Sequence, residues 1–270
     1  MIGYILYGRL TSTRLPGKAM LDIGGKSIVA IARDRVRLAP SVSTIVFATS
    51  TDPIDDPLVA RARSEGLPTY RGDADDVLRR LYEAAREHGL EWFLTAPLDT
   101  PIQFAEVLEA TVAELRTRDL DMVSSFPGQP NGTDCYGVRT SAAGRIVSMK
   151  QETDTGAWGK YFTDTGLFAW GEVNLFAHLP HLKDFRLTID YPEDFALLTR
   201  LYMDLVARHG EAFSLNDLIA MLETPGYQRD LAWMRDLETR WAQHFAHTGS
   251  PVDADVARIV REAKCQGTSA

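Results

Sequence analysis

The stretch "MIGYILYGRLTSTRLPGK" (residues 1–18) joins an apolar run to a basic, hydroxyl-rich segment. Residues 1–7 are rich in β-branched and aromatic side chains and predict a strand. The following residues contain Gly8, Pro16 and Gly17, which are typical of a loop. The basic segment therefore stands at the carboxyl end of the first predicted strand.

The residues after this loop alternate between short strand patterns and longer helical ones. Helices are expected over 26–39, 55–66 and 73–89, and strands over 44–50, 68–72 and 91–97. The strand "TIVFATS" is an almost unbroken apolar run, which is typical of a strand covered on both faces. This order predicts a three-layer α/β/α, Rossmann-like fold with a mostly parallel sheet. Such sheets bind ligands outside the carboxyl ends of their strands, where the basic loop lies.

The second half of the chain has a different pattern. A helix over 103–118 and a strand over 121–126 precede a predicted hairpin over 137–152 that turns at residues 143–144, and another strand is expected over 161–170. We expect these segments to form an antiparallel extension at the edge of the sheet. A strand and then a helix are expected over 185–210, a short helix near 214–223, and two amphipathic helices over 228–264, parted by residues 248–251. The predicted division is a main domain over 1–226 and a C-terminal helical extension over 227–270.

Composition and charge limit the functions that this chain could have. The chain has 270 residues, 45% hydrophobic and 24% charged, which is ordinary for one large globular domain. Its net charge of -8 disfavours nucleic acid and anionic membranes as partners. The two cysteines form neither a disulfide framework nor a zinc motif, and no apolar run reaches the roughly 20 residues of a membrane span. With no secretory leader in the sequence, we expect a cytoplasmic protein.

Three cations in the first loop, Arg9, Arg14 and Lys18, predict a phosphate site. Glycine and hydroxyl residues let backbone N–H groups approach a phosphate, which arginine and lysine then neutralise. The spacing matches neither the Walker A pattern nor the dinucleotide-binding pattern. The alternative is a surface loop whose cations pair with the acidic excess elsewhere in the chain.

The segment "GRLTSTRLPGKAMLDIGGKS" (8–27) resembles the signature of the sugar-acid cytidylyltransferases of the CMP-Kdo synthetase type. It resembles most closely the spore-coat polysaccharide synthesis proteins, whose loop runs arginine, two variable residues, serine, threonine, arginine, leucine, proline, glycine and lysine. Residues 9–18 match that loop at every position. Further matching segments follow in the family's order over 48–62, 70–85, 99–102 and 186–198, so that the resemblance covers about residues 1–205.

This resemblance implies a GT-A-like nucleotidyltransferase fold and a site for CTP. Arg9, Arg14 and Lys18 would then grip the triphosphate and act in catalysis. Tyr7, Gly8, Ser12, Arg71 and Asp99 would complete the nucleotide site, with Arg71 contacting the base or the ribose. The alternative for Arg71 is an ordinary surface arginine.

The resemblance also implies a magnesium ion, because displacement of pyrophosphate builds negative charge that cations must meet. Mg²⁺ takes one or two carboxylates together with phosphate oxygens and water. The matching carboxylates here are Asp99 in "PLDTP" and Asp190 in "TIDYPED", each of which follows a predicted strand. The alternative reading of each is a helix-capping or turn acid, which we prefer for Glu193 and Asp194.

Two departures from the family pattern concern the nucleotide base. Relatives carry glutamine and alanine where this chain has Tyr7 and Gly8, and a glycine where it has Leu98. Leu98 would crowd the approach to the nucleotide, and Pro97 removes a backbone donor. The choice of base is therefore open from the sequence.

The acceptor is expected to lie against the predicted antiparallel extension. The turn "PNGTDCYG" (130–137) matches a family turn at Asp134, and "FTDTGLFAW" (162–170) resembles the threonine-glycine strand under the sugar. We nominate Asp134, Thr165 and Gly166, with Lys150 as an anion contact. The alternative is a plain edge hairpin, which is the stronger reading for Lys150.

The C-terminal extension carries an aromatic stripe at helical spacing, Trp233, Trp241 and Phe245. Such a stripe is typical of packing against the main domain or another subunit. By analogy with similar enzymes we expect a homodimer.

Two classes of function remain open at this point. The first is a Mg²⁺-dependent cytidylyltransferase that transfers CMP to a sugar acid or sugar-like acceptor for a polysaccharide or a specialised metabolite. The alternative within this class is a nucleotidyltransferase that uses another NTP and transfers its nucleotide to a sugar phosphate or phosphonate. The second is a catalytically weak homologue that serves as a binding or assembly partner.

Overall fold

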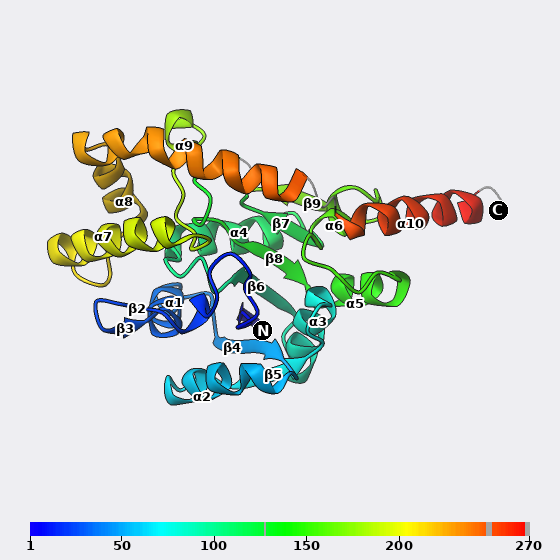
Figure 1. Cartoon of the computed structure of the whole chain (residues 1–270). Coiled ribbons are helices and arrows are strands. Elements are labelled where there is room, and N and C mark those ends of the chain that lie inside the picture. Colours follow the sequence, from blue (N-terminus) through cyan, green and yellow to red (C-terminus); the bar gives the residue numbers. More distant parts are fainter. Residues whose placement is uncertain (127, 247–249, 268–270) are drawn as a thin grey trace.

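The structure is a computed structural model that describes residues 1–126, 128–246 and 250–267. Its centre is a seven-stranded sheet with helices on both faces (Figure 1). The strands lie in the order β5-β4-β1-β6-β8-β7-β9. Their bounds are β1 Ile2–Tyr7, β4 Thr44–Ser50, β5 Thr69–Gly72, β6 Trp92–Pro97, β7 Met122–Ser124, β8 Tyr136–Arg139 and β9 Trp170–Glu172, and a separate two-stranded ribbon pairs β2 Asp22–Ile23 with β3 Lys26–Ser27.

The parallel half of the sheet confirms the strand and helix predictions for residues 1–117. β1 pairs in parallel with β4 on one side and β6 on the other, and β5 extends the sheet beyond β4. Because these strands are parallel, their carboxyl ends meet at one edge. The loop after β1 and the segment after β6 therefore open at the same place.

The other half of the sheet corrects the expected hairpin over 137–152. β8 is antiparallel to β6 and to β7, whereas β9 is parallel to β7. The segment after β8 is not a second strand but the helix α5, Thr140–Met149. Ala142, Ala143 and Ile146 recur at helical spacing and are buried. Gly144 makes no turn; it lets the ring of Tyr82 pack closely against this helix.

Two further strand predictions were wrong. The expected strand over 161–170 contains the short helix α6, Lys160–Thr163, and only its last residue belongs to β9. The expected strand over 185–190 is an extended loop with one isolated bridge, between Asn131 and Arg186. It hydrogen-bonds to two other loops, through Leu187 N to Asn131 O at 2.7 Å and Ile189 N to Asp99 O at 2.8 Å, so no single strand pairs with it.

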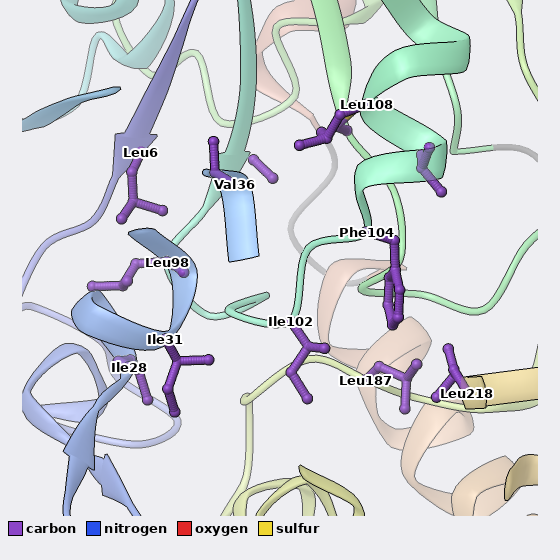
Figure 2. Close-up of a cluster of buried hydrophobic side chains, with 14 of the residues drawn as sticks. Leu6, Ile28, Ile31, Val36, Leu98, Ile102, Phe104, Leu108, Leu187 and Leu218 are labelled. Carbon is purple, nitrogen blue, oxygen red and sulfur yellow. The ribbon is translucent and has the colours of Figure 1, made fainter. Parts of the chain in front are cut away.

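The helices form the two outer layers. Their bounds are α1 Ile28–Val36, α2 Asp56–Ser64, α3 Val77–Glu87, α4 Ala105–Thr117, α7 Pro192–His209, α8 Leu215–Leu222, α9 Pro225–Ala246 and α10 Pro251–Gly267. Tyr4 and Leu6 of β1 face the cluster built with α1, α2, α4, α7, α8 and α9, and Figure 2 shows part of this cluster. Ile5 faces the opposite cluster, which α3, α5, α6 and α10 complete.

The two predicted C-terminal helices are confirmed as α9 and α10, and they pack on different faces of the molecule. Tyr227, Leu231 and Met234 of α9 join the first cluster. Val252, Val256 and Ile259 of α10 join the second one, and Figure 1 shows α10 (red) beside α6. A boundary at residues 226 and 227 stays a prediction.

Of the predicted aromatic stripe, Trp233 is 39% exposed, and the side chains of Trp241 and Phe245 lie outside those that the structure describes. Within the described residues, no helix is both long enough and apolar enough to span a membrane.

Candidate functional site

A cleft of about 220 Å³ opens at the carboxyl ends of β1 and β6. Six residues predicted for the nucleotide site line it: Tyr7, Gly8, Arg9, Ser12, Lys18 and Asp99. The remaining lining residues are Thr11, Ala19, Ile28, Val77, Arg80, Pro97 and Leu98. The structure therefore brings the first loop and the segment after β6 together, as parallel strands require.

Lys18 joins three segments that are far apart in the sequence. Its ammonium donates to Oδ2 of Asp99 at 2.5 Å, to Oδ1 of Asp190 at 3.0 Å and to the backbone oxygen of Ile189 at 2.7 Å. Lys18 begins a short 3₁₀ turn, and Gly17 before it has a φ of 72°, a left-handed conformation that favours glycine. The proline-glycine pair of the loop thus turns the lysine toward the two carboxylates.

Asp190 lies among three cations. Arg14 Nη2 donates to its Oδ1 at 2.5 Å, and Arg186 Nη2 donates to its Oδ2 at 3.0 Å. Burial alone would raise the pKa of Asp190, but the surrounding ammonium and guanidinium groups outweigh burial and hold this pKa below its usual value. Burial and the negative charge of Asp190 raise the pKa of Asp99, although Lys18 opposes them.

The turn that carries Asp190 is fixed by the start of α7. The Asp194 carboxylate accepts from the backbone N–H groups of Asp190 at 3.0 Å and Tyr191 at 2.9 Å. It also forms an ion pair with the buried Arg186 at 3.2 Å. Asp194 is therefore a capping acid, as the sequence indicated, and its role is to hold Asp190 in place.

Asp99 and Asp190 are close enough to share one cation, because the same ammonium contacts both carboxylates. Two carboxylates within reach of one point are a donor set that suits Mg²⁺, which takes its other ligands from phosphate and water. Within the part of the chain that the structure describes, there is no group of three or more His, Cys, Asp or Glu side chains that could hold a metal ion. The fit therefore rests on this pair of carboxylates.

Arg9 points to a different part of the cleft from Arg14 and Lys18. Its Nη1 donates to the backbone oxygen of Ala74 at 2.5 Å and to Oδ1 of Asp75 at 2.8 Å. These residues precede α3. Two cations of the loop, Arg14 and Lys18, therefore contact the acidic residues Asp99 and Asp190. The third cation, Arg9, contacts the segment before α3.

Leu98 lies in the lining of the cleft, and its effect on the approach of a nucleotide stays a prediction. It is 2% exposed, and in Figure 2 its side chain lies beside Leu6, Ile28 and Ile31. A Cβ on Gly8 would lie 3.1 Å from Leu98 Cβ, so the glycine leaves room for the leucine below it. Leu98 forms part of the floor of the cleft.

Arg71 lies outside the lining of this cleft. It donates to the backbone oxygens of Ser50 at 2.9 Å and Asp52 at 2.8 Å, and it pairs with Asp56 at 2.6 Å. These contacts bind it to the carboxyl end of β4. Its role at the base or the ribose stays a prediction.

The four residues nominated for the acceptor do not form one cluster with the cations. Asp134 is 6% exposed and accepts from Gly132 N at 2.9 Å; burial raises its pKa to about 6, and the charge of Asp99 adds to the shift. Lys150 is buried in an ion pair with Asp76. Thr165 donates to the backbone oxygen of Tyr161 at 2.7 Å, in the turn that contains Gly166.

Sequence reasoning missed Arg80 and Val77 of α3, which also line the cleft. Residues three apart share a helix face, so the spacing of these two could have indicated that they point the same way. It also missed Arg186, since nothing in the sequence marks it as the partner of Asp190.

The comparisons with known proteins agree with this geometry. A family model described as "Cytidylyltransferase" matches residues 4–139, which is half of the chain. The 3-deoxy-manno-octulosonate cytidylyltransferase of Chelativorans sp. is 28% identical over 189 residues, 65% of this chain and 70% of that protein. The spore coat polysaccharide biosynthesis protein SpsF of Bacillus subtilis is 28% identical over 113 residues, 40% of this chain and 47% of that protein. The matches thus span only about half the length of several curated relatives.

A solved structure extends the comparison to the fold. A cytidylyltransferase from Leptospira borgpetersenii aligns with a TM-score of 0.73 and 22% identity, covering 82% of this chain and 93% of that one. This likeness shows that the architecture is shared beyond the segment that the family model matches. From the family match and the loop it contains, the chain belongs to the cytidylyltransferase family.

Proposed function

We propose that this protein transfers CMP from CTP to a sugar acid or sugar-like acceptor and releases pyrophosphate. The observation that carries the proposal is the cluster of Arg14, Lys18, Asp99 and Asp190, of which Lys18 and Asp99 line the cleft. Membership of the family supports the nucleotide, and the printed name of the Chelativorans relative supports an acidic sugar as acceptor. The resemblance to spore-coat proteins supports a role in polysaccharide or specialised-metabolite synthesis.

The proposed chemistry needs positive charge on both sides of the α-phosphorus. An acceptor hydroxyl oxygen forms the new P–O bond and loses its proton to solvent, and the bond between the α-phosphorus and the oxygen that bridges to the β-phosphate breaks as pyrophosphate leaves. Lys18 and Arg14 lie where they could neutralise the charge on the transferred and leaving oxygens. Magnesium, held by Asp99 and Asp190, would supply Lewis-acid stabilisation of the same charge.

Binding of the nucleotide would replace the ion pairs that Lys18 makes with Asp99 and Asp190. Lys18 is 11% exposed and lies between two carboxylates, which together raise its pKa although burial lowers it. A phosphate chain would replace these carboxylates as the partner of Lys18. The carboxylates would then be free to bind the metal, so the same residues serve the site before and after the nucleotide binds.

The base and acceptor residues are part of the proposal. Tyr7, Gly8 and Ser12 line the cleft where the base and the phosphates would lie. Asp134 lies close enough to Asp99 for their charges to interact, which supports a place for the acceptor beside the proposed metal site. Thr165, Gly166, Lys150 and Arg71 keep their nominated roles as predictions.

Thermal unfolding with each of the four NTPs, with and without Mg²⁺, tests the function. A ligand at one hundred times its Kd adds about 2.7 kcal/mol to the free energy of unfolding. We expect CTP with Mg²⁺ to stabilise the protein selectively, and Asp99→Asn and Asp190→Asn to abolish this effect. Pyrophosphate release with 3-deoxy-manno-octulosonate as a first acceptor then measures transfer.

Stabilisation by a different NTP would move the assignment to that nucleotide and a sugar phosphate or phosphonate acceptor. No stabilisation by any nucleotide would contradict the enzyme and favour a binding or assembly partner. The expected homodimer is a separate prediction, which light scattering after size-exclusion chromatography measures.

A further inference from the structure

Three arginines are almost completely buried in the described part of the chain, and two of them have obvious partners. Arg186, 1% exposed, pairs with Asp190 and Asp194. Arg35, 2% exposed, donates to two backbone oxygens and lies over the ring of Phe213, with its Cζ 3.9 Å from the centroid. The third, Arg80, differs from both.

Arg80 is 1% exposed and lacks a carboxylate partner among the described residues. Its Nη1 donates to the backbone oxygens of Asp73 at 2.6 Å and Ala74 at 3.1 Å. Its Nε is buried without a hydrogen-bond acceptor among the described atoms. Burial of a charge is costly, and Asp55 and Asp73 act on Arg80 without an ion pair or hydrogen bond from their carboxylates to it among the described residues. An anion in the cleft would therefore improve the surroundings of this guanidinium.

A second arginine lies directly beside Arg80. Arg9 Nη1 also donates to the backbone oxygen of Ala74, at 2.5 Å, so the two guanidinium groups meet at one oxygen. Both arginines line the cleft. The carboxylate that Arg9 contacts, Asp75, has a side chain that is 68% exposed, and such a surface ion pair offsets little of the repulsion.

Burial and then the positive charge of Arg9 lower the pKa of Arg80, while Tyr7, Asp55 and Asp73 act against this shift. An anion bound in the cleft would interact favourably with both guanidinium groups. Two planar donor groups side by side suit the oxygens of a phosphate or a carboxylate.

We infer that Arg9 and Arg80 form a paired-arginine subsite for a substrate oxyanion, in the same cleft as Lys18 and Asp99. The inference rests on the proposed function and adds a binding residue, Arg80, on α3. Arg14 and Lys18 contact Asp190 and Asp99 instead, and under the proposed function they serve the phosphate chain at that separate cluster. The oxyanion is either a phosphate of the nucleotide or the carboxylate of the acceptor.

The test compares Arg80→Met with Arg79→Met. Methionine keeps an unbranched apolar stem where the stem of Arg80 packs against Gly72. A Cβ built on Gly72 would lie 3.2 Å from the Arg80 Cγ, so this space is tightly filled. Arg79 is adjacent on α3, has a 43% exposed side chain and pairs with Asp76 outside the cleft lining, so it is the matched control. Dissociation constants of CTP, pyrophosphate and 3-deoxy-manno-octulosonate are measured by calorimetry with Mg²⁺ present, together with the Tm of each ligand-free protein.

We expect Arg80→Met to weaken at least one of these ligands by about tenfold or more, equivalent to about 1.4 kcal/mol, while Arg79→Met binds like the wild type. Weaker CTP and pyrophosphate would identify a phosphate as the oxyanion, and weaker octulosonate alone would identify the carboxylate. The Tm of ligand-free Arg80→Met should stay near that of the wild type, because an unpaired buried charge is removed. Arg80→Lys should recover part of the affinity.

Equal affinity of Arg80→Met and the wild type for every ligand overturns the inference, and so does a wild type that binds none of the three. A lower Tm with unchanged affinities would overturn it too, because Arg80 would then only hold the loop before α3. If the wild type binds pyrophosphate through Arg80 but does not bind CTP, the proposed function fails and the subsite stands. If CTP binds and is turned over equally well without Arg80, only the subsite fails.

Discussion

Asp134→Asn should stabilise the protein, and the gain should grow as the pH rises. The Asp134 carboxylate is 6% exposed, and its pKa is raised from 3.8 to about 6, first by burial and then by the charge of Asp99. A carboxylate whose pKa is higher in the folded state stabilises that state only when protonated. Its ionisation therefore lowers the free energy of unfolding as the pH rises through the window from 3.8 to about 6.

The size of the effect follows from the shift. A difference of one unit in pKa is worth about 1.4 kcal/mol, so the wild type loses about 3 kcal/mol through this group once the pH is above both values. Asparagine cannot ionise, and its carbonyl oxygen can still accept from Gly132 N. The variant should thus gain about 1 kcal/mol over the wild type at pH 4.5 and about 3 kcal/mol at pH 8.

Urea unfolding of both proteins at pH 4.5, 6 and 8 measures this difference. Asp154→Asn is the control, because it makes the same change at an exposed carboxylate. A gain for Asp134→Asn that is constant across the three pH values, or a loss at pH 8, would refute the reasoning. Because a carboxylate retained at such a cost is expected at a functional site, we also expect the more stable variant to lose activity with the acceptor.

Three further changes have separate physical causes. Gly132→Ala should lower Tm and abolish stabilisation by CTP with Mg²⁺, because its Cβ would lie 2.3 Å from the backbone oxygen of Leu187 at a φ of +99° and displace the loop ahead of the acidic residues. Asp255→Ala should lower the free energy of unfolding by about 2 to 4 kcal/mol in urea, since it removes an acceptor of the buried Tyr161 hydroxyl and of backbone N–H groups. Lys18→Met should lower the rate of pyrophosphate release at least about 100-fold.

For the glycine and lysine changes, matched variants separate the assigned cause from general damage. Gly25→Ala adds a Cβ at a φ of +81° with nothing within 4 Å, so it should cost only the backbone strain of about 1 to 2 kcal/mol. Lys26→Met removes a lysine that pairs with Asp34 and Glu211 away from the cleft lining and should keep the rate of pyrophosphate release. Equal effects of each variant and its control would contradict the assigned cause.

The parallel half of the fold could be predicted because its signals are local. The strands over residues 2–7, 44–50 and 92–97 are short apolar runs closed by turn residues, and two of the helices between them, α2 and α3, are followed by a glycine with a positive φ. Once these strands are parallel, Asp99 must open at the same edge as Lys18. The pairing of these two residues therefore follows from the order of the elements alone.

The segment over 140–170 could not be predicted in the same way because its signals are ambiguous. Thr140, Val147 and a glycine at 144 suit a hairpin, yet Ala142, Ala143 and Ile146 are buried at helical spacing. The burial surface that decides between the two is Tyr82 and the rest of α3, which lies some 60 residues earlier in the chain. Tertiary contact overrode the local pattern.

Asp190 shows why a correct residue can be reached through a wrong element. A strand over 185–190 would have carried it to the sheet edge, but an extended loop does so instead, held by the N–H of Ile189 on Asp99 O and by the capping acid Asp194. The two carboxylates are therefore linked through backbone as well as through Lys18. Any change that loosens this loop separates the carboxylates, so the geometry of the proposed metal site depends on loop packing and not on sheet pairing. The same dependence explains why the residues proposed for the acceptor, which lie in loops, are the ones that local sequence signals describe least.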